Sequence, residues 1–252
     1  MLAPLIVSHA ACKGHAPENT LAGIEAALRL GVDAIEIDVH ASSDGTPVLI
    51  HDDTLERTTN GGGRVQETTL ARLRTLDAAG GLFEGRFAGE RIPTLAEVLD
   101  RTRDACLLVI EIKQTGIESA VATVVRRLRA AQSAMIWSFH ADVVEAARVS
   151  LPEVPAARLW TGRDGDGDAL LATTLRSGAQ AVSVHGPALD APLMTAARRR
   201  GLSVFTWTVD DPEEQARVAA LGVAGICTNY PDVLRTTLSR QAFDLPSAQQ
   251  AG

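Results

Sequence analysis

The strongest constraint on the fold of this chain is the regular alternation of short β-rich runs with helical segments. Eight such runs follow one another, at residues 5–9, 33–39, 107–113, 135–139, 156–160, 181–185, 202–208 and 225–228. Each is followed by a segment with apolar residues at helical spacing, and most of these segments end at a glycine. This alternation predicts a (β/α)₈ TIM barrel. An open, dinucleotide-binding sheet is disfavoured, because no glycine fingerprint follows the first run.

The sequence indicates a single domain, residues 1–240, with one interruption of the alternation. After the second run and an extended piece at 47–51, residues 52–91 are polar and rich in glycine. We expect them to form a small insertion after the second strand. The helix that follows should begin at Thr94, with Glu97 completing a capping box. Residues 241–252, rich in Gln, Ala and Ser, are predicted to be a disordered tail.

Composition and charge exclude several classes of partner. The net charge of −7 and the pI of about 5.4 predict no attraction to nucleic acid or to an anionic membrane surface. No apolar run is long enough for stable membrane insertion, and no basic segment with a cleavage site precedes the first strand. The three cysteines are far apart, which argues against a disulfide framework or a zinc cluster. We therefore expect a cytoplasmic protein with a small-molecule substrate, and the sequence gives no oligomeric state.

Charged residues occur at a spacing of two inside two predicted strands. Glu36 and Asp38 alternate with isoleucines, and Glu111 and Lys113 do the same further along the chain. Because strand residues alternate between two faces, each pair shares one face. All four lie near the carboxyl ends of their strands, which surround the active-site mouth of a TIM barrel. Three negative charges and one positive charge leave −2, so the pattern predicts a site for one divalent cation.

Short motifs around these residues follow a fixed order along the chain. They are His9, 17–20 (Pro-Glu-Asn-Thr), 36–38, 44–45 (Asp-Gly), 51–52 (His-Asp), 57–61 (Arg-Thr-Thr-Asn-Gly), 93–95 (Pro-Thr-Leu), 111–113 (Glu-Ile-Lys), 207–209 (Trp-Thr-Val) and 225–231. Together they resemble the glycerophosphodiester phosphodiesterase family over nearly the whole chain. The resemblance implies a (β/α)₈ barrel in which the insertion after the second strand helps to shape the substrate pocket.

The resemblance also implies a reaction. Glu36, Asp38 and Glu111 match the metal carboxylates of the family, and His9 and His51 match its acid/base pair. The implied activity is metal-dependent hydrolysis of a glycerophosphodiester to an alcohol and glycerol phosphate. The cofactor is one divalent cation, either Mg²⁺ or Ca²⁺. The sequence does not assign the acid and the base between the two histidines, and it does not identify the alcohol.

Further positions match residues that contact or surround the substrate in the family. Lys113 and Trp207 match residues that line the substrate site, and Glu18 matches a carboxylate near it. From the residue types alone, Lys113 is equally well explained as an ion-pair partner of Glu111, and Trp207 as a packing residue of the barrel. These two explanations stay open at the level of the sequence.

The chain differs from the family at two places. The first motif normally reads His-Arg-Gly, whereas here His9 is followed by Ala10 and Ala11. The missing arginine would hold the substrate phosphate with a bidentate fork. Lys13, which is nearest in the loop, or Lys113 could supply a positive charge instead, and His15 could supply a hydrogen-bond donor. In addition, residue 210 is Asp where the family often has Asn, and residue 229 is Asn where it often has Asp.

Two other functions compete with the leading hypothesis. The absence of the arginine favours a lysophospholipase D-like enzyme, or another phosphodiesterase for small diesters, because the space at Ala10 would admit a bulkier substrate. A non-catalytic barrel that binds a phosphorylated ligand is the third hypothesis. Retention of both histidines and of all three acids argues against it.

Overall fold

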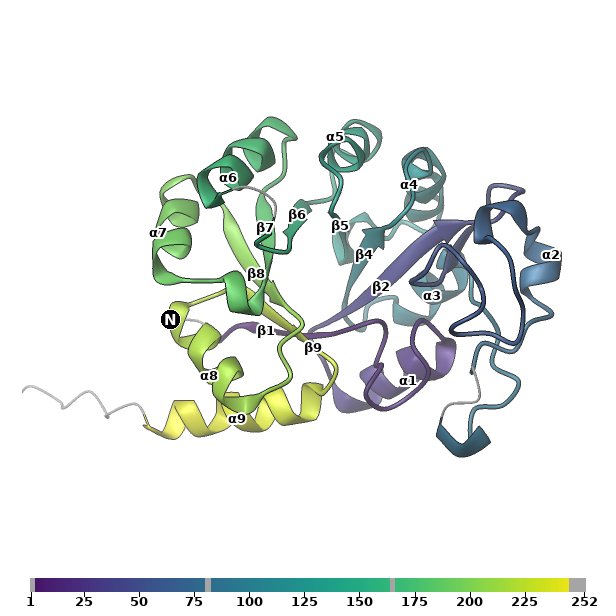
Figure 1. Ribbon diagram of the computed structural model, residues 1–252, viewed down its shortest axis with the longest axis horizontal. Helices are drawn as coiled ribbons and strands as arrows, with labels where there is room; N and C mark the ends of the chain where they lie inside the picture. Colours follow the sequence, from purple (N-terminus) through teal and green to yellow (C-terminus); the bar gives the residue numbers. More distant parts are fainter. Residues whose placement is uncertain (1–2, 80–82, 164–165, 245–252) are drawn as a thin grey trace, which may run out of the picture.

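The computed structural model describes residues 3–79, 83–163 and 166–244. Within these residues, eight parallel strands close into a barrel, because β1 (Leu5–Ser8) pairs with both β2 (Ala34–Ala41) and β9 (Gly225–Thr228). Between β2 and β9 the circuit runs through β4 (Leu107–Ile112), β5 (Ala134–Ser138), β6 (Ala156–Trp160), β7 (Ala181–His185) and β8 (Ser203–Trp207). Figure 1 shows this ring of strands. The predicted (β/α)₈ barrel is confirmed.

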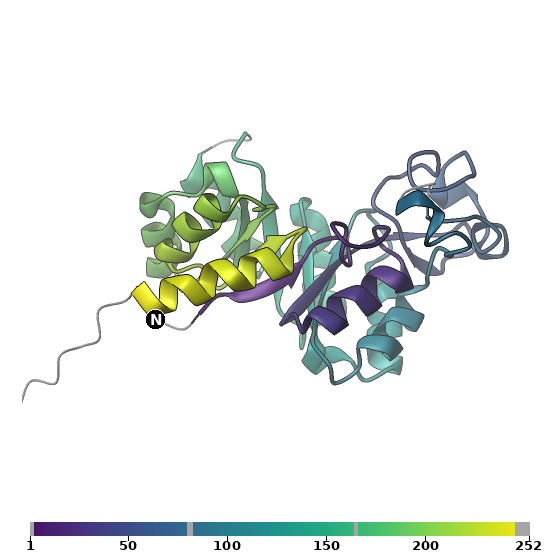
Figure 2. The ribbon, with the colours of Figure 1, turned by 90° about the horizontal axis from the view of Figure 1, so that it is seen from below.

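Helices surround the barrel on its outside, as Figures 1 and 2 show. They are α1 (Leu21–Leu30), α3 (Leu95–Thr102), α4 (Glu118–Arg127), α5 (Ala141–Ser150), α6 (Gly167–Arg176), α7 (Ala191–Arg199), α8 (Pro212–Leu221) and α9 (Pro231–Asp244). Short 3₁₀ turns η3 (Ala131–Ser133) and η4 (Gly186–Ala188) precede β5 and α7. The expected capping box at the start of α3 is present, since Thr94 and Glu97 exchange hydrogen bonds between side chain and backbone.

The alternation of each strand divides the apolar residues between two cores. Inward-facing side chains such as Val109, Trp137 and Phe205 fill the barrel, whereas Ile35, Ile110 and their equivalents pack between the strands and the helices. The outer core is the larger of the two. Because the inner face of β2 and β4 continues into charged residues at the carboxyl end, the barrel interior changes there from apolar to ionic.

The predicted insertion lies between β3 (Pro47–Leu49) and α3 and has an apolar cluster of its own. It contains η1 (Val65–Glu67), α2 (Leu70–Leu73) and η2 (Phe83–Gly85), and strand β3 pairs antiparallel with β2. Val65, Leu73 and Ile92 are among its buried residues. Hydrogen bonds from Ser43 N to Thr68 O (3.0 Å) and from Leu70 N to Asp44 Oδ1 (3.1 Å) hold it against the turn after β2. The insertion therefore lies beside the carboxyl ends of β2 and β4.

The C-terminal helix differs from the prediction made for the end of the chain. The disordered tail was expected from residue 241, whereas α9 continues to Asp244. Residues 241–244 include Gln and Ala, which favour helix and extend the preceding turns without a break. The remainder of the predicted tail, 245–252, lies outside the described residues. No helix in the described part of the chain has the length and apolar character required to cross a membrane.

Candidate active site

The carboxyl ends of β2 and β4 bring three acidic side chains together inside the barrel. Asp38 and Glu111 are register neighbours, and Glu36 occupies the preceding inward-facing position on β2. One carboxylate oxygen from each residue lies within 4.8 Å of the others, and Glu36, Asp38 and Glu111 are 2, 1 and 8% exposed. The structure thus joins the three acids that the alternation placed on one face.

Lys113 supplies the positive charge nearest to this cluster. Its Nζ atom lies 2.9 Å from Glu111 Oε1 and 3.3 Å from Asp38 Oδ1. Burial disfavours the ammonium ion, but Asp38 and Glu111 outweigh burial and raise the pKa of Lys113 above its usual range. Lys113 is therefore an ion-pair partner of the cluster, which is the role that its position beside Glu111 suggested.

One lysine does not offset three buried carboxylates. Burial, followed by repulsion from Asp38 and Glu111, raises the pKa of Glu36 well above its usual value. Burial and Asp38 likewise raise the pKa of Glu111 to about 7. For Asp38, burial acts in the same direction, but Lys113 and His51 outweigh it and lower the pKa of Asp38. With all three acids ionised, the cluster would hold more negative charge than Lys113 balances, and this repulsion adds to burial in raising the pKa of Glu36 and Glu111.

The donor set of this cluster fits a hard divalent cation. Glu36 Oε2 accepts a hydrogen bond from Ala10 N (2.8 Å), whereas the buried Glu36 Oε1 has no hydrogen-bond partner among the described residues. A buried carboxylate oxygen without a partner costs free energy, and a cation bound by all three carboxylates would remove that cost. Oxygen ligands of this kind suit Mg²⁺ or Ca²⁺ rather than a soft metal.

Asn19 holds Asp38 in place from the loop that follows β1. Its Nδ2 atom donates to Asp38 Oδ2 (2.8 Å), and Asp38 N donates back to Asn19 Oδ1 (3.0 Å). Asn19 has a φ of 56°, a left-handed conformation that asparagine tolerates better than most residues. These two bonds fix the carboxylate orientation, so Asn19 belongs to the site although its motif was not assigned that role.

The two alanines that replace Arg-Gly form a left-handed turn at the cluster. Ala10 and Ala11 have φ values of 46° and 68°. This turn directs Ala10 N to the Glu36 carboxylate and Ala11 N to Glu36 O (2.7 Å). The left-handed conformation costs an alanine about 1–2 kcal/mol relative to the right-handed one. The close approach of Gly23, where an added Cβ would lie 2.9 Å from Ala11 Cβ, leaves room for the Ala11 side chain.

His9 follows β1 directly and is oriented by a pair of residues from the opposite end of the chain. Its Nδ1 atom lies 2.8 Å from Asn229 Oδ1, and Asn229 Nδ2 donates to Asp210 Oδ2 (2.7 Å). Because the amide nitrogen of Asn229 is used by Asp210, its oxygen faces His9 and must accept the Nδ1 proton. The Nε2 atom of neutral His9 is then a proton acceptor. Burial lowers the pKa of His9, despite opposing effects from Asn229 and Asp38.

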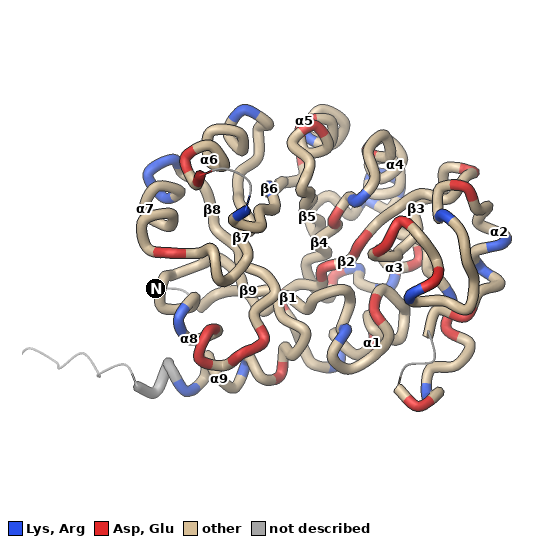
Figure 3. The backbone as a smooth tube through the Cα atoms, viewed as in Figure 1, with Lys and Arg blue, Asp and Glu red and all other residues tan. Residues whose placement is uncertain are grey.

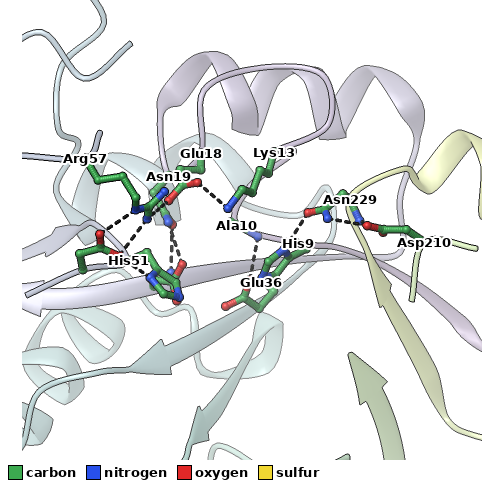
Figure 4. A network of polar contacts seen from close by, with 12 residues as sticks. His9, Ala10, Lys13, Glu18, Asn19, Glu36, His51, Arg57, Asp210 and Asn229 are labelled. Atoms are coloured by element: carbon green, nitrogen blue, oxygen red, sulfur yellow. Dashed lines mark hydrogen bonds and ion pairs between the residues drawn. The ribbon is translucent and has the colours of Figure 1, made fainter. Parts of the chain in front are cut away.

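His51 is oriented by a chain of charged groups at the edge of the insertion. His51 Nδ1 lies 2.7 Å from Asp52 Oδ1, and Arg57 binds both carboxylate oxygens of Asp52 at 2.6 and 2.9 Å. Arg57 also contacts Glu18 Oε1 (2.6 Å), and Lys13 Nζ lies 2.8 Å from Glu18 Oε2. The Arg57 guanidinium holds the pKa of Asp52 below its usual range. Figure 4 shows this chain on the His51 side of the site and the Asn229–Asp210 pair on the His9 side.

The substrate-site residues inferred from the sequence lie in different surroundings. Glu18 is nearly buried between Lys13 and Arg57, and the Lys13 side chain is 43% exposed. Trp207 lies at the far side of the mouth, at the end of β8. Its indole Nε1 donates to Ser183 O (3.0 Å), and its ring contacts Phe139 and His185 at centroid distances of 5.3 and 5.2 Å. The indole thus packs in an aromatic group. The other role considered for Trp207, as a wall of the substrate pocket, remains a prediction.

Comparison with known proteins identifies the family. The family model of the glycerophosphoryl diester phosphodiesterases matches residues 9–233. The chain belongs to this family. A glycerophosphodiester phosphodiesterase of Caldanaerobacter subterraneus is 34% identical over 91% of this chain and 96% of the relative. The crystal structure of the glycerophosphodiester phosphodiesterase of Agrobacterium tumefaciens is 31% identical, with a TM-score of 0.82 over 92% of this chain and 99% of that one.

A second solved structure shows a relative with a reaction product. The phosphodiesterase of Oleispira antarctica, in complex with the product sn-glycerol-3-phosphate, is 26% identical, with a TM-score of 0.85 over 94% of this chain and 97% of that one. Membership in the family makes this chain a phosphoric diester hydrolase of the glycerophosphodiester phosphodiesterase type. The resemblance inferred from the motifs is confirmed, and with it the enzyme class.

Besides Asn229, which contacts His9, four further residues contribute to the site without having been assigned a role from the sequence. Asn19, Asp52 and Arg57 belong to motifs that define the family resemblance, so their positions in the chain were visible as a signal. The fourth, Asp210, was noted only as a departure from the family. Its contact with Asn229 joins two loops that lie 19 residues apart, and no local pattern predicts such a contact.

Proposed function

We propose that this enzyme hydrolyses glycerophosphodiesters to an alcohol and glycerol phosphate, with Glu36, Asp38 and Glu111 holding one divalent cation and His9 and His51 transferring protons. The observation that carries the proposal is the buried cluster of three carboxylates, in which Glu36 Oε1 has no partner among the described residues, with an oriented histidine on each side of it. When bound, the cation would offset the charge that builds on the phosphoryl oxygens. Either Mg²⁺ or Ca²⁺ suits the three carboxylates.

His9 is the proton acceptor in this proposal. Its Nδ1 proton is committed to Asn229, and burial lowers the pKa of His9, so that the neutral imidazole predominates near neutral pH. The Nε2 lone pair can then accept a proton from the attacking oxygen. A general base of this kind must be neutral before the transition state and positioned by its other nitrogen. The Asn229 contact provides that positioning.

His51 is the proton donor. Its Nδ1 atom faces the carboxylate of Asp52, which orients the ring and leaves the Nε2 atom toward the reacting groups in this proposal. The two oxygens of Asp52 are shared with Arg57, which keeps Asp52 charged and fixed. His51 can therefore carry a proton from its Nε2 atom to the departing alkoxide. This assignment gives the two histidines, which the sequence left equivalent, separate tasks.

Lys13 and Lys113 are the cations available for the substrate phosphate. Lys113 lies at the cluster, where it is held by Asp38 and Glu111. Lys13 lies on the turn that follows His9, and its ammonium group is partly exposed beside Glu18. Lys13 is our candidate for the role of the missing arginine, with a single charge in place of a bidentate fork. Trp207 supplies an apolar wall opposite these lysines.

The structure weakens the rival reading as a lysophospholipase D-like enzyme. That hypothesis rested on free space at Ala10, but Ala10 is 1% exposed and Ala11 is 0% exposed. The positions next to His9 are therefore covered by the protein, which argues against the use of Ala10 as room for a bulkier substrate.

Turnover measurements test the proposal. We expect glycerol phosphate release from glycerophosphocholine to stop in excess chelator and to return with Mg²⁺ or Ca²⁺. His9→Ala and His51→Ala should each lower turnover by about 10²–10⁴. His15→Ala is the matched control, because His15 contacts Asp232 and Tyr230 outside the cluster. Undiminished activity in excess chelator would refute the metal-dependent mechanism.

The acid and base assignments have a test of their own. A diester with a nitrophenol leaving group needs little protonation of the departing oxygen, so His51→Ala should recover most of its activity on that substrate. His9→Ala should not recover, because the attacking oxygen still has to lose its proton. The reverse pattern of recovery would exchange the two roles.

A further inference from the structure

A cavity lined by polar and charged residues lies next to the metal cluster, on the side of the insertion. Its volume is about 270 Å³, and its lining includes His40, Arg64, Gln66, Lys113, Gln114 and His140. We call this cavity the Gln66 pocket. Because Val39 pairs with Ile112, and Lys113 N donates to Val39 O (3.1 Å), His40 and Lys113 form the layer that follows Asp38 and Glu111. Lys113 belongs both to this lining and to the acid cluster, so the pocket lies next to the proposed site of the phosphate.

The charged residues of the lining are already engaged in ion pairs. The lining therefore offers mainly hydrogen-bond donors and acceptors to a ligand. Arg64 Nη2 lies 2.7 Å from Asp53 Oδ2, and the Lys113 ammonium is held by the cluster acids. The remaining side chains of the lining carry amide, hydroxyl and imidazole groups, those of Gln66, Gln114, Thr115, His40 and His140. Gln114 is fixed by a hydrogen bond from Ala41 N to its Oε1 (3.1 Å), which leaves its amide NH₂ as a donor. Groups of this kind match hydroxyls, which donate and accept at once.

The same lining is unsuited to a quaternary ammonium group. The described residues around the cavity include no Phe, Tyr or Trp, so they provide no aromatic face for a cation–π contact. The one carboxylate, that of Asp53, is engaged by Arg64. A choline group placed here would lose its hydration without gaining a partner. A polyol would exchange its bonds to water for bonds to the amides and imidazoles.

The position of the pocket indicates which arm of the substrate it receives. His40 Nε2 lies 3.3 Å from His51 O, so the pocket adjoins His51 and not His9. In the proposed function, on which this inference rests, His51 protonates the departing alcohol. At about 30 Å³ per water molecule, the cavity volume corresponds to roughly nine waters, which is ample for a small polyol.

We propose that the Gln66 pocket binds the alcohol arm of the diester and selects a polyhydroxylated alcohol over choline. Gln66 is the residue best placed to test this. It follows Val65, which is 1% exposed in the core of the insertion, so the backbone at Gln66 is anchored while its side chain lines the pocket. The amide of Gln66 has no role in the catalytic contacts described above.

The experiment compares glycerophosphoglycerol with glycerophosphocholine. The wild-type enzyme should have the higher kcat/KM for glycerophosphoglycerol. Gln66→Leu should lower that value about three- to tenfold more than the value for glycerophosphocholine, the range expected for one lost hydrogen bond to a hydroxyl. Gln132→Leu is the matched control, because Gln132 lies in η3 before β5, at the other end of the barrel. It should leave the ratio of the two values unchanged.

The binding of the same two diesters, measured by calorimetry in chelator where no turnover occurs, separates failure of this inference from failure of the proposed function. Weaker binding of glycerophosphoglycerol by Gln66→Leu, with little change for glycerophosphocholine, supports the pocket even if neither diester is hydrolysed. An equal loss for both diesters, or no change for either, in binding and in kcat/KM overturns it. A wild-type preference for glycerophosphocholine would also overturn it.

Discussion

The two sides of the barrel mouth differ in the chemistry of their inward-facing residues. At the ends of β1, β2 and β4, next to the insertion, carboxylates, histidines and lysines are linked by short hydrogen bonds and ion pairs. At the ends of β5, β7 and β8, the corresponding residues are Phe139, His185 and Trp207, which contact one another through their rings. Figure 3 shows acidic residues gathered around β2 and β4. We call these the ionic side and the aromatic side.

The difference between these sides shows how one barrel places the groups that carry out the reaction on one side and the groups that shape the substrate site on the other. Groups that move protons or hold a cation must be oriented by partners, and each group on the ionic side has such a partner. An aromatic wall acts through area and shape, so small displacements there cost less. We therefore expect substitutions on the ionic side to lower kcat, and substitutions on the aromatic side to change KM.

The largest contrast is expected between Asp38→Asn and Ser183→Ala. Asp38→Asn removes one charged ligand from the cluster, and we expect neither metal binding nor turnover to be detectable in this variant. Ser183 faces the barrel interior on β7, is 0% exposed, and its Oγ has no partner among the described residues, so Ser183→Ala should retain nearly full activity. Metal binding is measured by calorimetry. A Ser183→Ala enzyme as inactive as Asp38→Asn would break the comparison.

The metal affinity itself should depend on pH. Because burial and Asp38 raise the pKa of Glu111 to about 7, protons compete with the cation for this carboxylate as the pH falls through that value. The apparent affinity should therefore be lower at pH 6 than at pH 8, and protons should be released on binding. Glu111→Gln cannot take up this proton, so it should remove that part of the pH dependence.

Lys13→Ala is expected to have the next largest effect. If Lys13 holds the substrate phosphate, its loss removes a charge-assisted hydrogen bond worth about 1.5–3 kcal/mol, or roughly one to two decades in kcat/KM. Glu18 would still be held by Arg57, so the ionic side should remain assembled. Lys13→Arg, which keeps the charge, is the control and should retain most of the activity. Unchanged kcat/KM in Lys13→Ala would assign the phosphate to Lys113 instead.

The barrel and the acid cluster were predictable because local periodicity encodes both. The alternation of acids and isoleucines in β2 placed Glu36 and Asp38 on one face, and the repeated β-then-α order placed that face inside the barrel. The strand ends differed slightly, since β2 extends to Ala41 and β3 ends at Leu49. Such differences arise because the strand ends are set by the antiparallel pairing of β2 with β3. The periodicity of a single segment does not reveal which segment it will pair with, so it does not predict these ends.

The contacts that orient the site were less predictable, because they join segments far apart in sequence. Arg57 comes from the insertion and reaches Glu18, which is 39 residues away. Asn229 reaches His9 across 220 residues. The family motifs marked Arg57 as a notable residue, but only the folded chain shows which carboxylates it contacts. The departure at residues 210 and 229 proved informative for the same reason, since the two side chains bind each other.

A smaller effect is expected from exchanging these two residues. The double substitution Asp210→Asn with Asn229→Asp keeps the net charge and an amide–carboxylate pair, but places the carboxylate beside His9. A carboxylate there favours the imidazolium, so the pKa of His9 should rise. Because His9 is the proposed base, it must be neutral to act. The fall in activity on lowering the pH should therefore begin at a higher pH than in the wild-type enzyme, and a pH profile of kcat/KM measures this. Asp210→Asn alone keeps the amide at His9 and is the control.

The smallest effect is expected on the aromatic side, at Trp207. Trp207→Leu removes the ring that contacts Phe139 and His185, and with it the hydrogen bond from Nε1 to Ser183 O. If the ring serves as a wall for the substrate, binding in the ground state and in the transition state should weaken together, so KM should rise about two- to tenfold while kcat stays nearly constant. Trp207→Phe keeps an aromatic face, so its KM should lie between that of the wild-type enzyme and that of Trp207→Leu. Thermal unfolding of both variants shows how much of the change is a loss of packing. A fall in kcat as large as that expected for His9→Ala would mean that the aromatic side takes part in the reaction, and the division between the two sides would have to be abandoned.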